Sequence, residues 1–342
     1  MIDVTTRCNL DCPVCYSNRN NQEDLPLDLL RRLAVKYSGK IISLCGGEPT
    51  VRKDLPDIIK LFSKRSTVFL VTNGIALTDS DYVKNLRNNG LRYISFSFNG
   101  LSDEIYERIN GKPLLRLKLK ALDNIKKTGI QIILSVLLVR GLNESQIKGI
   151  LKYCLENRDF IKELRIRTMV PISKYLPGEK YSIDELINTV CRESGIKKED
   201  VLRELELKKE INSFFGREIF ILRSCSFDFH LRRRGSRFVP VGHNLKIGAP
   251  FEWIKAYGIK MPINGLLKAG FKRENTPWIH GRDFFKIGLR SWPDKHDIDM
   301  EENKKCQTGY YLDGRELSFC YANILKDSSD DRVFFGGERR CQ

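Results

Sequence analysis

Residues 7–16 read Arg-Cys-Asn-Leu-Asp-Cys-Pro-Val-Cys-Tyr and directly follow a short apolar segment, Ile2–Val4, which we expect to be a β-strand. This stretch decides the fold because its three cysteines, Cys8, Cys12 and Cys15, have the spacing C-x3-C-x2-C in one short loop. Iron–sulfur clusters are bound by cysteine thiolates. Three thiolates in a tight loop can hold three irons of a cubic cluster, which leaves the fourth iron able to bind another molecule.

A zinc site is the alternative for this loop. Structural zinc usually has four cysteine or histidine ligands, commonly arranged in closely spaced pairs. The next cysteine or histidine after Cys15 is Cys45, which lies well beyond the loop. The number of nearby ligands therefore favours a cluster over zinc.

A second motif, Cys45-Gly46-Gly47-Glu48-Pro49, ends the apolar run 41–44. Adjacent glycines let the backbone approach a ligand closely, and the carboxylate of Glu48 can accept hydrogen bonds from an ammonium group. The motif follows the cysteine loop by about one strand–helix unit. We therefore expect both motifs at the carboxyl ends of two β-strands.

Together these motifs resemble the radical S-adenosylmethionine (radical SAM) superfamily. In that family the unliganded iron of a [4Fe–4S] cluster chelates the amino and carboxylate groups of S-adenosylmethionine, and the glycine-rich turn receives the ammonium. The resemblance implies cleavage of S-adenosylmethionine to a 5′-deoxyadenosyl radical, with a one-electron donor of the ferredoxin or flavodoxin type. The residues it assigns are the catalytic cluster ligands Cys8, Cys12 and Cys15 and the cofactor-binding turn Gly46, Gly47, Glu48 and Pro49.

Strand and helix patterns alternate throughout residues 1–195. Apolar runs recur at 41–44, 67–71, 92–98, 130–139 and 164–170, and segments of helical period lie between them, including 55–61, 114–128 and 144–154. Six such units predict an α/β fold, an all-parallel sheet rolled into a partial (β/α)6 barrel of the radical SAM type, with active loops at the strand carboxyl ends. We expect residues 1–195 to form this core and residues 196–342 to form a basic C-terminal cap with an auxiliary cluster.

Two further strand ends fit the superfamily. Thr72 and Asn73, followed by Gly74, close the third strand and are expected to donate to the cofactor carboxylate, although an ordinary Asn-Gly turn would look the same. Ser97 and Asn99 alternate on the fourth strand, so both point to one face and suit the ribose hydroxyls. Val14 stands where the superfamily usually has an aromatic residue, and we expect it to pack against adenine.

The remaining cysteines form two sets. Cys154 and Cys191 lie in amphipathic helical patterns and are expected to be small buried hydrophobes. Four others lie in polar sequence after the barrel. A [4Fe–4S] cluster takes four cysteine ligands, so these four could bind a second cluster: Cys225, Cys306, Cys320 and Cys341. Cys306 and Cys320 with Gly314 between them resemble part of the auxiliary-cluster domains of radical peptide maturases. Free thiols, or one zinc with His230 or His243, are the alternatives.

Three longer stretches resemble a narrower group, which contains the archaeal tetraether lipid synthase and radical methylases that act on pterin precursors. They are residues 100–143, 182–200 and 292–320. Members of that group often carry a cysteine-bearing N-terminal extension, whereas this sequence begins at the first strand. They also tend to have a second cysteine or histidine pair shortly after the position of Cys225, where this sequence reads Cys-Ser-Phe-Asp-Phe-His.

The sequence is strongly basic, with a net charge of +16 from 59 Lys and Arg against 43 Asp and Glu. The excess is spread along the chain, +9 over residues 1–200 and +7 over residues 201–342, where it includes the run Arg232-Arg233-Arg234. It favours an anionic partner, which we expect to be a lipid-like or phosphorylated substrate. Nucleic acid is a less favoured partner, and peripheral contact with a membrane is a further possibility. The alternative to any anionic partner is that the basic surface is only solvated. A substrate role predicts that the three arginines lie at the barrel mouth and hold phosphate.

Composition limits the class of protein. With 41% hydrophobic and 30% charged residues, the chain is typical of a soluble globular protein. No apolar run is long enough for a membrane span, and we predict no signal peptide. Ten cysteines without a secretory signal favour the reducing cytoplasm, with metal ligation in place of disulfides.

The expected reaction is hydrogen abstraction from unactivated carbon, for C–C bond formation or methylation on an anionic lipid, isoprenoid or small molecule. A radical SAM peptide maturase or RNA-modifying enzyme with an auxiliary cluster is the second interpretation. The third interpretation is a non-catalytic iron–sulfur or zinc protein that binds nucleic acid. This interpretation assigns no function to the glycine-rich turn.

Overall fold

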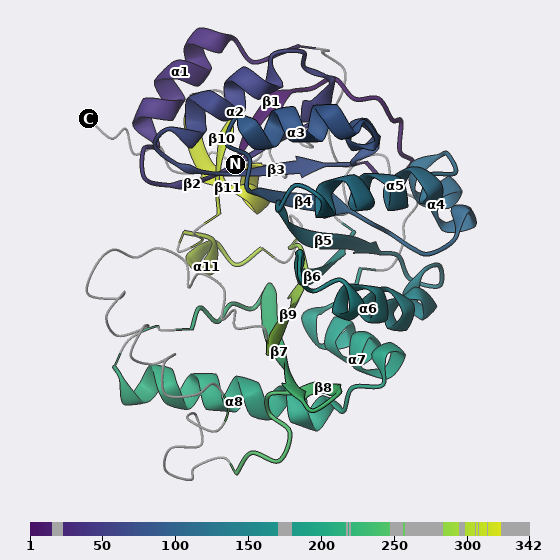
Figure 1. Ribbon diagram of the computed structural model, residues 1–342. Helices are drawn as coiled ribbons and strands as arrows, with labels where there is room; N and C mark the ends of the chain where they lie inside the picture. Colours follow the sequence, from purple (N-terminus) through teal and green to yellow (C-terminus); the bar gives the residue numbers. More distant parts are fainter. Residues whose placement is uncertain are drawn as a thin grey trace.

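The computed structural model describes residues 1–15, 23–169, 180–216, 218, 220–246, 256, 283–293, 298–304, 306, 308–312 and 314–322. Strands and helices alternate through its first half (Figure 1). The elements in order are β1 (Ile2–Thr5), α1 (Leu27–Lys36), β2 (Ile41–Gly46), η1 (Pro49–Val51), α2 (Leu55–Ser63), β3 (Thr67–Thr72), η2 (Ile75–Thr78), α3 (Ser80–Asn88), β4 (Tyr93–Ser97), α4 (Asp103–Asn110), α5 (Leu115–Lys126), β5 (Gln131–Leu138), η3 (Glu144–Gln146), α6 (Ile147–Glu156) and β6 (Ile161–Thr168).

The first six strands are neighbours in chain order and all run parallel. Parallel neighbours need crossover connections, and here helices supply them along the outer side of the curved sheet (Figure 1). The predicted α/β fold with a partial barrel is confirmed. The carboxyl ends of these strands share one edge, which is where the cysteine loop and the glycine-rich turn begin.

Later segments extend the same sheet at both edges. Beside β6 lie β9 (Phe284–Arg290), which is parallel to it, and then the antiparallel strands β7 (Ser226–Arg234) and β8 (Arg237–Pro240). Beside β1 lie β10 (Gly309–Leu312), which is parallel to it, and the antiparallel strand β11 (Arg315–Ser318). The sheet therefore continues past residue 195, and the division of the chain there stays a prediction.

The remaining named helices are α7 (Ile183–Ser194), α8 (Lys198–Phe214) and α11 (Met300–Lys304). Ser182 caps α7 by accepting from the N–H of Glu185, whose side chain accepts from the Ser182 N–H, and Gly195 ends this helix with a φ of +74°. None of the helices in the described part of the chain is both long and apolar enough to span a membrane.

The two faces of the sheet differ in character. Along β4, Ile94 and Phe96 are buried against the helices, while Tyr93, Ser95 and Ser97 are partly exposed on the opposite face, which we call the inner face. Strand pairing in register continues this alternation from β3 to β9. Each fully buried Leu or Ile of the outer face contributes about 1.5–3 kcal/mol relative to an exposed one. The outer face thus stabilises the barrel, and the inner face carries the polar groups.

Candidate active site at the carboxyl ends of the strands

The cysteine loop leaves the carboxyl end of β1 with its three thiols partly exposed. The N–H of Cys15 donates to the carbonyl of Cys12 (3.1 Å), which makes a tight turn through Pro13 and Val14. Val14, expected to pack against adenine, is partly exposed in this turn. The predicted cluster ligands therefore lie in one compact loop with accessible sulfur atoms.

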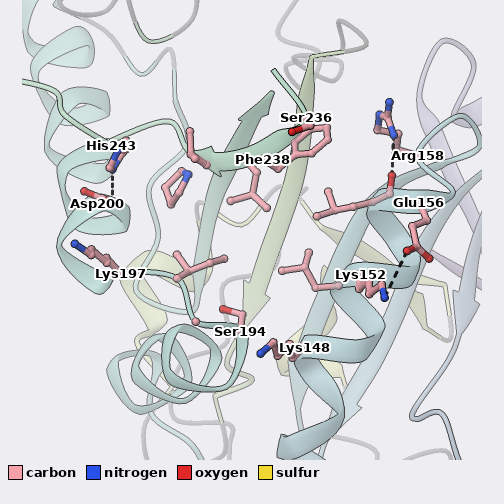
Figure 2. A pocket seen from close by; sticks show the side chains of 17 residues that line it. Lys148, Lys152, Glu156, Arg158, Ser194, Lys197, Asp200, Ser236, Phe238 and His243 are labelled. Atoms are coloured by element: carbon pink, nitrogen blue, oxygen red, sulfur yellow. Dashed lines mark hydrogen bonds and ion pairs between the residues drawn. The ribbon is translucent and has the colours of Figure 1, made fainter. Parts of the chain in front are cut away.

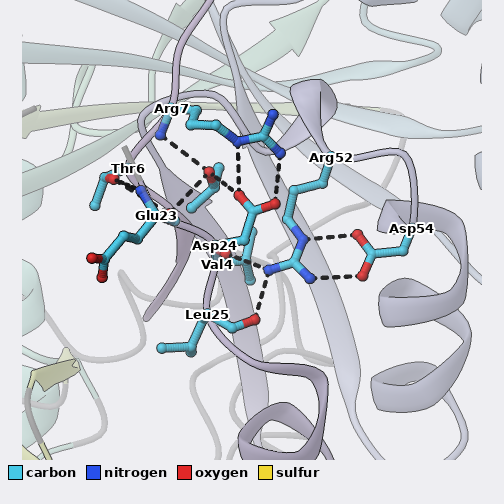
Figure 3. A network of polar contacts seen from close by, with 9 residues as sticks. Val4, Thr6, Arg7, Glu23, Asp24, Leu25, Arg52 and Asp54 are labelled. Atoms are coloured by element: carbon cyan, nitrogen blue, oxygen red, sulfur yellow. Dashed lines mark hydrogen bonds and ion pairs between the residues drawn. The ribbon is translucent and has the colours of Figure 1, made fainter. Parts of the chain in front are cut away.

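A polar network closes the base of this loop (Figure 3). Arg7 precedes the cysteines and Asp24 follows them, and their ion pair has two N···O contacts of 3.0 and 2.6 Å. The Thr5 hydroxyl also donates to Asp24 (2.6 Å). Burial alone would raise the pKa of Asp24, but hydrogen bonds from Arg7 and Thr5 lower it below its ordinary value. The two ends of the loop are thereby held together.

A buried arginine ties this base to the second motif (Figure 3). The guanidinium of Arg52 is 4% exposed and donates to the carbonyls of Val4 (2.6 Å) and Leu25 (2.8 Å), on either side of the loop. Its other edge donates twice to Asp54, at 2.8 and 2.7 Å. Arg52 follows the glycine-rich turn by three residues, so its hydrogen bonds connect that turn to the base of the cysteine loop.

The glycine pair lets the second motif lie directly against the cysteine loop. A Cβ at Gly46 would come within 2.1 Å of the Thr5 carbonyl oxygen, and a Cβ at Gly47 within 2.2 Å of the Arg7 carbonyl oxygen. In place of side chains, the N–H groups of Gly47 and Glu48 donate to these carbonyls, at 2.9 and 2.8 Å. Gly46 also has a φ of +137°, which favours glycine. No other residue fits at either position without moving the loop.

The carboxylate of Glu48 is hydrogen-bonded inside the protein. Glu48 is 1% exposed. It accepts hydrogen bonds from the N–H and hydroxyl of Thr50 (3.1 and 2.7 Å), the hydroxyl of Thr72 (2.7 Å) and the N–H of Asn73 (2.6 Å). The pairing of β3 with β2 brings these donors against the turn. Glu48 and Thr72 therefore join two strand ends, and their expected contacts with the cofactor stay predictions.

A chain of buried amides joins β5 to the cysteine loop. Asn99 is 2% exposed, accepts from the N–H of Leu137 (3.0 Å) and donates to the Asn110 oxygen (3.1 Å). Asn110, at the end of α4, donates in turn to the sulfur of Cys12 (3.3 Å). Asn99 is thus an internal link, and its expected contact with the ribose stays a prediction. Sequence reasoning missed Asn110 because it lies 98 positions from Cys12 and belongs to no motif.

Two serines stand side by side on the inner face at this end of the sheet. Ser97 of β4 pairs in register with Ser135 of β5. Ser135 is 2% exposed, and its hydroxyl has no hydrogen-bond partner among the residues that the structure describes. A buried polar group without a partner is costly, so the serine pair marks a place that a polar ligand would complete. Ser97 keeps its expected position, and Ser135 is an addition to the candidate site.

Lys118 of α5 is a buried cation behind this edge, and sequence reasoning missed it as well. It is 1% exposed, and its ammonium donates to the carbonyls of Asn73 (2.5 Å) and Ser97 (3.0 Å). The rings of Phe96 and Tyr106 lie 5.4 and 5.7 Å from it. Burial lowers the pKa of Lys118 to about 8, against the opposing effect of nearby negative groups. A single lysine in an amphipathic helix gives no signal of such a position.

Three of the C-terminal cysteines lie near one another. Cys225 precedes β7, Cys306 follows α11 and Cys320 follows β11. Burial raises the pKa of Cys320 to about 12, and the other two thiols add to this shift. Burial and the Cys306 thiol likewise raise the pKa of Cys225. Cys341, the fourth expected ligand, lies outside the described residues, so the second cluster stays a prediction.

Both histidines considered as zinc ligands contact carboxylates of α8. The Nδ1 atom of His230 lies 2.7 Å from Glu204, and that of His243 lies 2.9 Å from Asp200. Burial lowers the pKa of His230, although Glu204 opposes the shift. In the described ranges, no three Cys, His, Asp or Glu side chains are grouped closely enough to hold a single metal ion.

The arginines Arg232, Arg233 and Arg234 lie at the opposite end of the sheet from the cysteine loop, which corrects our expectation. They end β7, which runs antiparallel to β9, so that Arg232 pairs with Phe284 at the start of β9. Because β9 is parallel to β6, this is the amino end of the barrel strands. The direction of β7, which the sequence does not reveal, places this charge away from the barrel mouth.

A separate pocket of about 580 Å³ lies near that amino end, between α6, the α7–α8 connection and the β7–β8 hairpin (Figure 2). Apolar side chains such as Leu155 and Phe238 line it together with Lys148, Lys152 and Lys197. His243, considered above as a zinc ligand, also lines this pocket, whereas the predicted cluster ligands and cofactor-binding residues do not.

The two motifs at one edge of a partial barrel are features of the radical SAM superfamily. Comparison with known families agrees, because the model of the Radical SAM superfamily matches residues 2–154, which run from β1 into α6. These residues belong to the radical SAM superfamily, and the resemblance inferred from the sequence is confirmed.

Named relatives point to the same class. A 7,8-dihydro-6-hydroxymethylpterin dimethyltransferase from Methanocaldococcus jannaschii is 38% identical over 177 residues, which cover 48% of this chain and 35% of the relative. A GTP 3′,8-cyclase from Nautilia profundicola is 30% identical over 163 residues, covering 44% and 51%. The chain thus spans about half or less of the length of these relatives. Among solved structures, Streptococcus suis SuiB bound to precursor peptide SuiA has a TM-score of 0.48 at 20% identity, covering 55% of this chain and 43% of SuiB.

Proposed function

We propose that this protein binds a [4Fe–4S] cluster on Cys8, Cys12 and Cys15 and S-adenosylmethionine beside it on the inner face. When bound, this pair would supply a 5′-deoxyadenosyl radical that abstracts hydrogen from unactivated carbon. The observation that carries the proposal is the contact between the two motifs, where the Gly46–Gly47 turn lies against the cysteine loop with no room for side chains. A cofactor held by the loop would meet the backbone of that turn.

The residues present fit such a cofactor. The amide of Asn110 donates to the sulfur of Cys12, and a hydrogen bond of this kind favours the thiolate that binds iron. The hydroxyls of Ser97 and Ser135 offer adjacent partners for ribose hydroxyls. The chain itself binds and orients the cofactor and excludes water, while the cofactor supplies the radical chemistry.

Lys118 supports this site through its neighbours. By donating to the carbonyls of Asn73 and Ser97, it fixes the ends of β3 and β4 relative to each other. Its buried positive charge also favours negative groups nearby, because charges interact more strongly away from water. We therefore assign Lys118 a positioning role.

We also propose that Cys225, Cys306 and Cys320 bind a second [4Fe–4S] cluster, with Cys341 as the fourth ligand. The Cys225 and Cys306 thiols raise the pKa of Cys320, and the Cys306 thiol raises the pKa of Cys225, which supports their grouping. Cysteine thiolates are the usual ligands of such clusters. A single zinc ion at the same thiols is the competing interpretation.

For the reaction, we propose C–C bond formation or methylation on an anionic substrate, which includes lipid-like and phosphorylated molecules. The names of the relatives, a pterin dimethyltransferase and a GTP cyclase, support a small-molecule substrate. A one-electron donor of the ferredoxin or flavodoxin type would serve as partner in the cytoplasm. Peripheral membrane contact is part of the proposal only for a lipid substrate, and peptide or RNA substrates are the alternatives.

The test is anaerobic reconstitution with iron and sulfide, followed by assay of 5′-deoxyadenosine formed from S-adenosylmethionine with dithionite. The wild type should form this product, and a variant with Cys8, Cys12 and Cys15 all replaced by Ala should not. Cys154→Ala, a buried cysteine of α6, is the matched control. Product formation by the triple variant would refute the cluster assignment. Absence of product from a wild type that binds nucleic acid would favour the non-catalytic interpretation.

A further inference from the structure

The pocket near the amino end of the barrel strands is built from three parts of the chain. They are α6, the connection from α7 to α8, and the β7–β8 hairpin at the edge of the sheet (Figure 2). Its volume of about 580 Å³ lies within the range of about 300–1,000 Å³ that is usual for sites of small organic ligands. The pocket is therefore large enough for a ligand of its own, away from the cysteine loop.

Regular backbone structure sets the shape of this pocket. Gly195 ends α7 with a φ of +74°, and α8 begins three residues later, so the connection along one wall is short. On another wall, Leu231 of β7 pairs in register with Pro240 of β8. A third wall is the helix α6. Because each wall is a helix, a hairpin or a three-residue turn, the fold itself forms the pocket.

The floor of the pocket is apolar. Leu151 is buried, whereas Leu155, Ile196 and Phe238 pack against the main core and remain partly exposed. Transfer of apolar surface out of water is favourable, so an apolar group would be stabilised on this floor. A basic surface that is only solvated has no need of such a floor. The occupant of the pocket should therefore have an apolar body.

Both carboxylates that line the pocket already have cationic partners (Figure 2). Glu156 lies 3.9 Å from the ammonium of Lys152. Asp200 accepts a hydrogen bond from Arg203 (2.6 Å) and lies 2.9 Å from Nδ1 of His243. These pairs compensate the negative charge of the lining. The remaining cations therefore decide which charge the pocket attracts.

Lys148 and Lys197 are those remaining cations. Both line the pocket, and among the residues that the structure describes neither is paired with a carboxylate. Lys148 lies in the first turn of α6, and Lys197 directly precedes α8, where no side chain caps the first N–H groups. The start of a helix carries partial positive charge, which adds to that of the two ammonium groups. The rim of the pocket thus favours a negative group above an apolar floor.

We propose that this pocket binds a small amphipathic anion, a molecule with one apolar chain and a terminal carboxylate or phosphate. The chain would lie against Leu155 and Phe238, and the anionic group would contact Lys148 and Lys197. The site lies at the opposite end of the sheet from the cysteine loop, so its ligand is separate from the cofactor. The proposal therefore does not depend on the radical chemistry proposed above.

The test is calorimetric titration of the full chain with octanoate, octyl phosphate and 1-octanol, without S-adenosylmethionine. The wild type should bind both anions more tightly than the alcohol, and added salt should weaken only the binding of the anions. The double variant Lys148→Gln/Lys197→Gln should bind the anions about three- to tenfold more weakly, because each exposed ion pair contributes little. Its binding of octanol should not change. Lys60→Gln/Lys120→Gln, with the same loss of charge at exposed positions outside the pocket, should bind as the wild type does.

The apolar floor is tested separately through Phe238. Phe238→Ala should weaken the binding of all three compounds, whereas Phe238→Leu should keep most of the affinity. Melting temperatures check that each variant is folded. A preference for octanoate or for octyl phosphate supports the proposal and identifies the acidic group.

Several results would overturn the proposal. They are no binding of either anion by the wild type, equal affinities for octanoate and octanol, and equal losses in the two double variants. Flotation with vesicles of anionic lipid, without binding of the free anions, would assign the basic surface to a membrane and would also refute the site. Because no turnover is measured, a failure to form 5′-deoxyadenosine would count against the proposed function without affecting this result.

Discussion

Lys118 holds two strand ends with a single ammonium group. Its hydrogen bonds go to the backbone carbonyls of Asn73 and Ser97 and not to a carboxylate. The strand-end geometry of the active site therefore depends on a side chain from a helix that contains no motif. We therefore expect a substitution at Lys118 to affect both stability and cofactor binding.

Replacing Lys118 by Met should remove both hydrogen bonds while keeping much of the volume of the side chain. Each buried carbonyl left without a donor costs about 1–3 kcal/mol, so we expect a lower free energy of unfolding in denaturant titrations. Binding of S-adenosylmethionine to the reconstituted protein should weaken because the ends of β3 and β4 are no longer fixed. Lys120→Met, an exposed position on the same helix, is the control. Unchanged cofactor affinity in Lys118→Met would argue against a positioning role.

At the scale of elements, the turn after β2 and the loop after β1 fit together through their backbones. Gly47→Ala should push them apart, since its Cβ would lie 2.2 Å from the Arg7 carbonyl oxygen. We expect weaker binding of S-adenosylmethionine in equilibrium dialysis, with little change in iron content. Gly149→Ala is the matched control, because its Cβ would meet only the flexible end of Leu101. Equal affinities of the two variants would show that the close approach is not needed for the cofactor.

The base of the cysteine loop should respond to pH through Asp24. The pKa of Asp24 is lower in the folded protein than its ordinary value of 3.8, so the carboxylate stabilises the folded state above that pH. This contribution is lost as pH falls through the folded pKa. Asp24→Asn should therefore unfold more readily than the wild type at pH 7, and the difference should shrink in acid. A difference in unfolding free energy that is the same at pH 7 and pH 3 would contradict this assignment.

At the scale of the whole molecule, the sheet joins the N-terminal barrel to the segments that carry the C-terminal cysteines. If Cys225, Cys306 and Cys320 bind a second cluster, Cys320→Ala should lower the iron content from about eight to about four atoms per chain. Formation of 5′-deoxyadenosine without substrate should persist. Cys191→Ala, in α7, should keep the full iron content. A Cys320→Ala protein that retains all its iron would remove this residue from the ligand set.

Local patterns predicted the parts of the fold that depend on neighbouring residues. The cysteine loop, the glycine-rich turn and the parallel strands β1–β6 could be read from the sequence because each has its own spacing or period. Lys118 and Asn110 could not, because helix packing brings them to the site from distant positions. The direction of β7 could not be predicted from the sequence either. Because β7 runs antiparallel to β9, Arg232 lies at the end of the sheet away from the barrel mouth, whereas Arg290 lies on the inner face.

The strand that carries the cysteine loop has a neighbour from the far end of the chain. β10 pairs with β1 through Tyr311 and Ile2. A ribosome makes β1 before β10, so β1 remains an unpaired edge on that side until the segment around residue 309 has been synthesised. Pairings between such distant segments also form slowly. Delivery of iron and sulfide to Cys8, Cys12 and Cys15 is therefore expected to follow the synthesis and pairing of β10, as a late step of maturation.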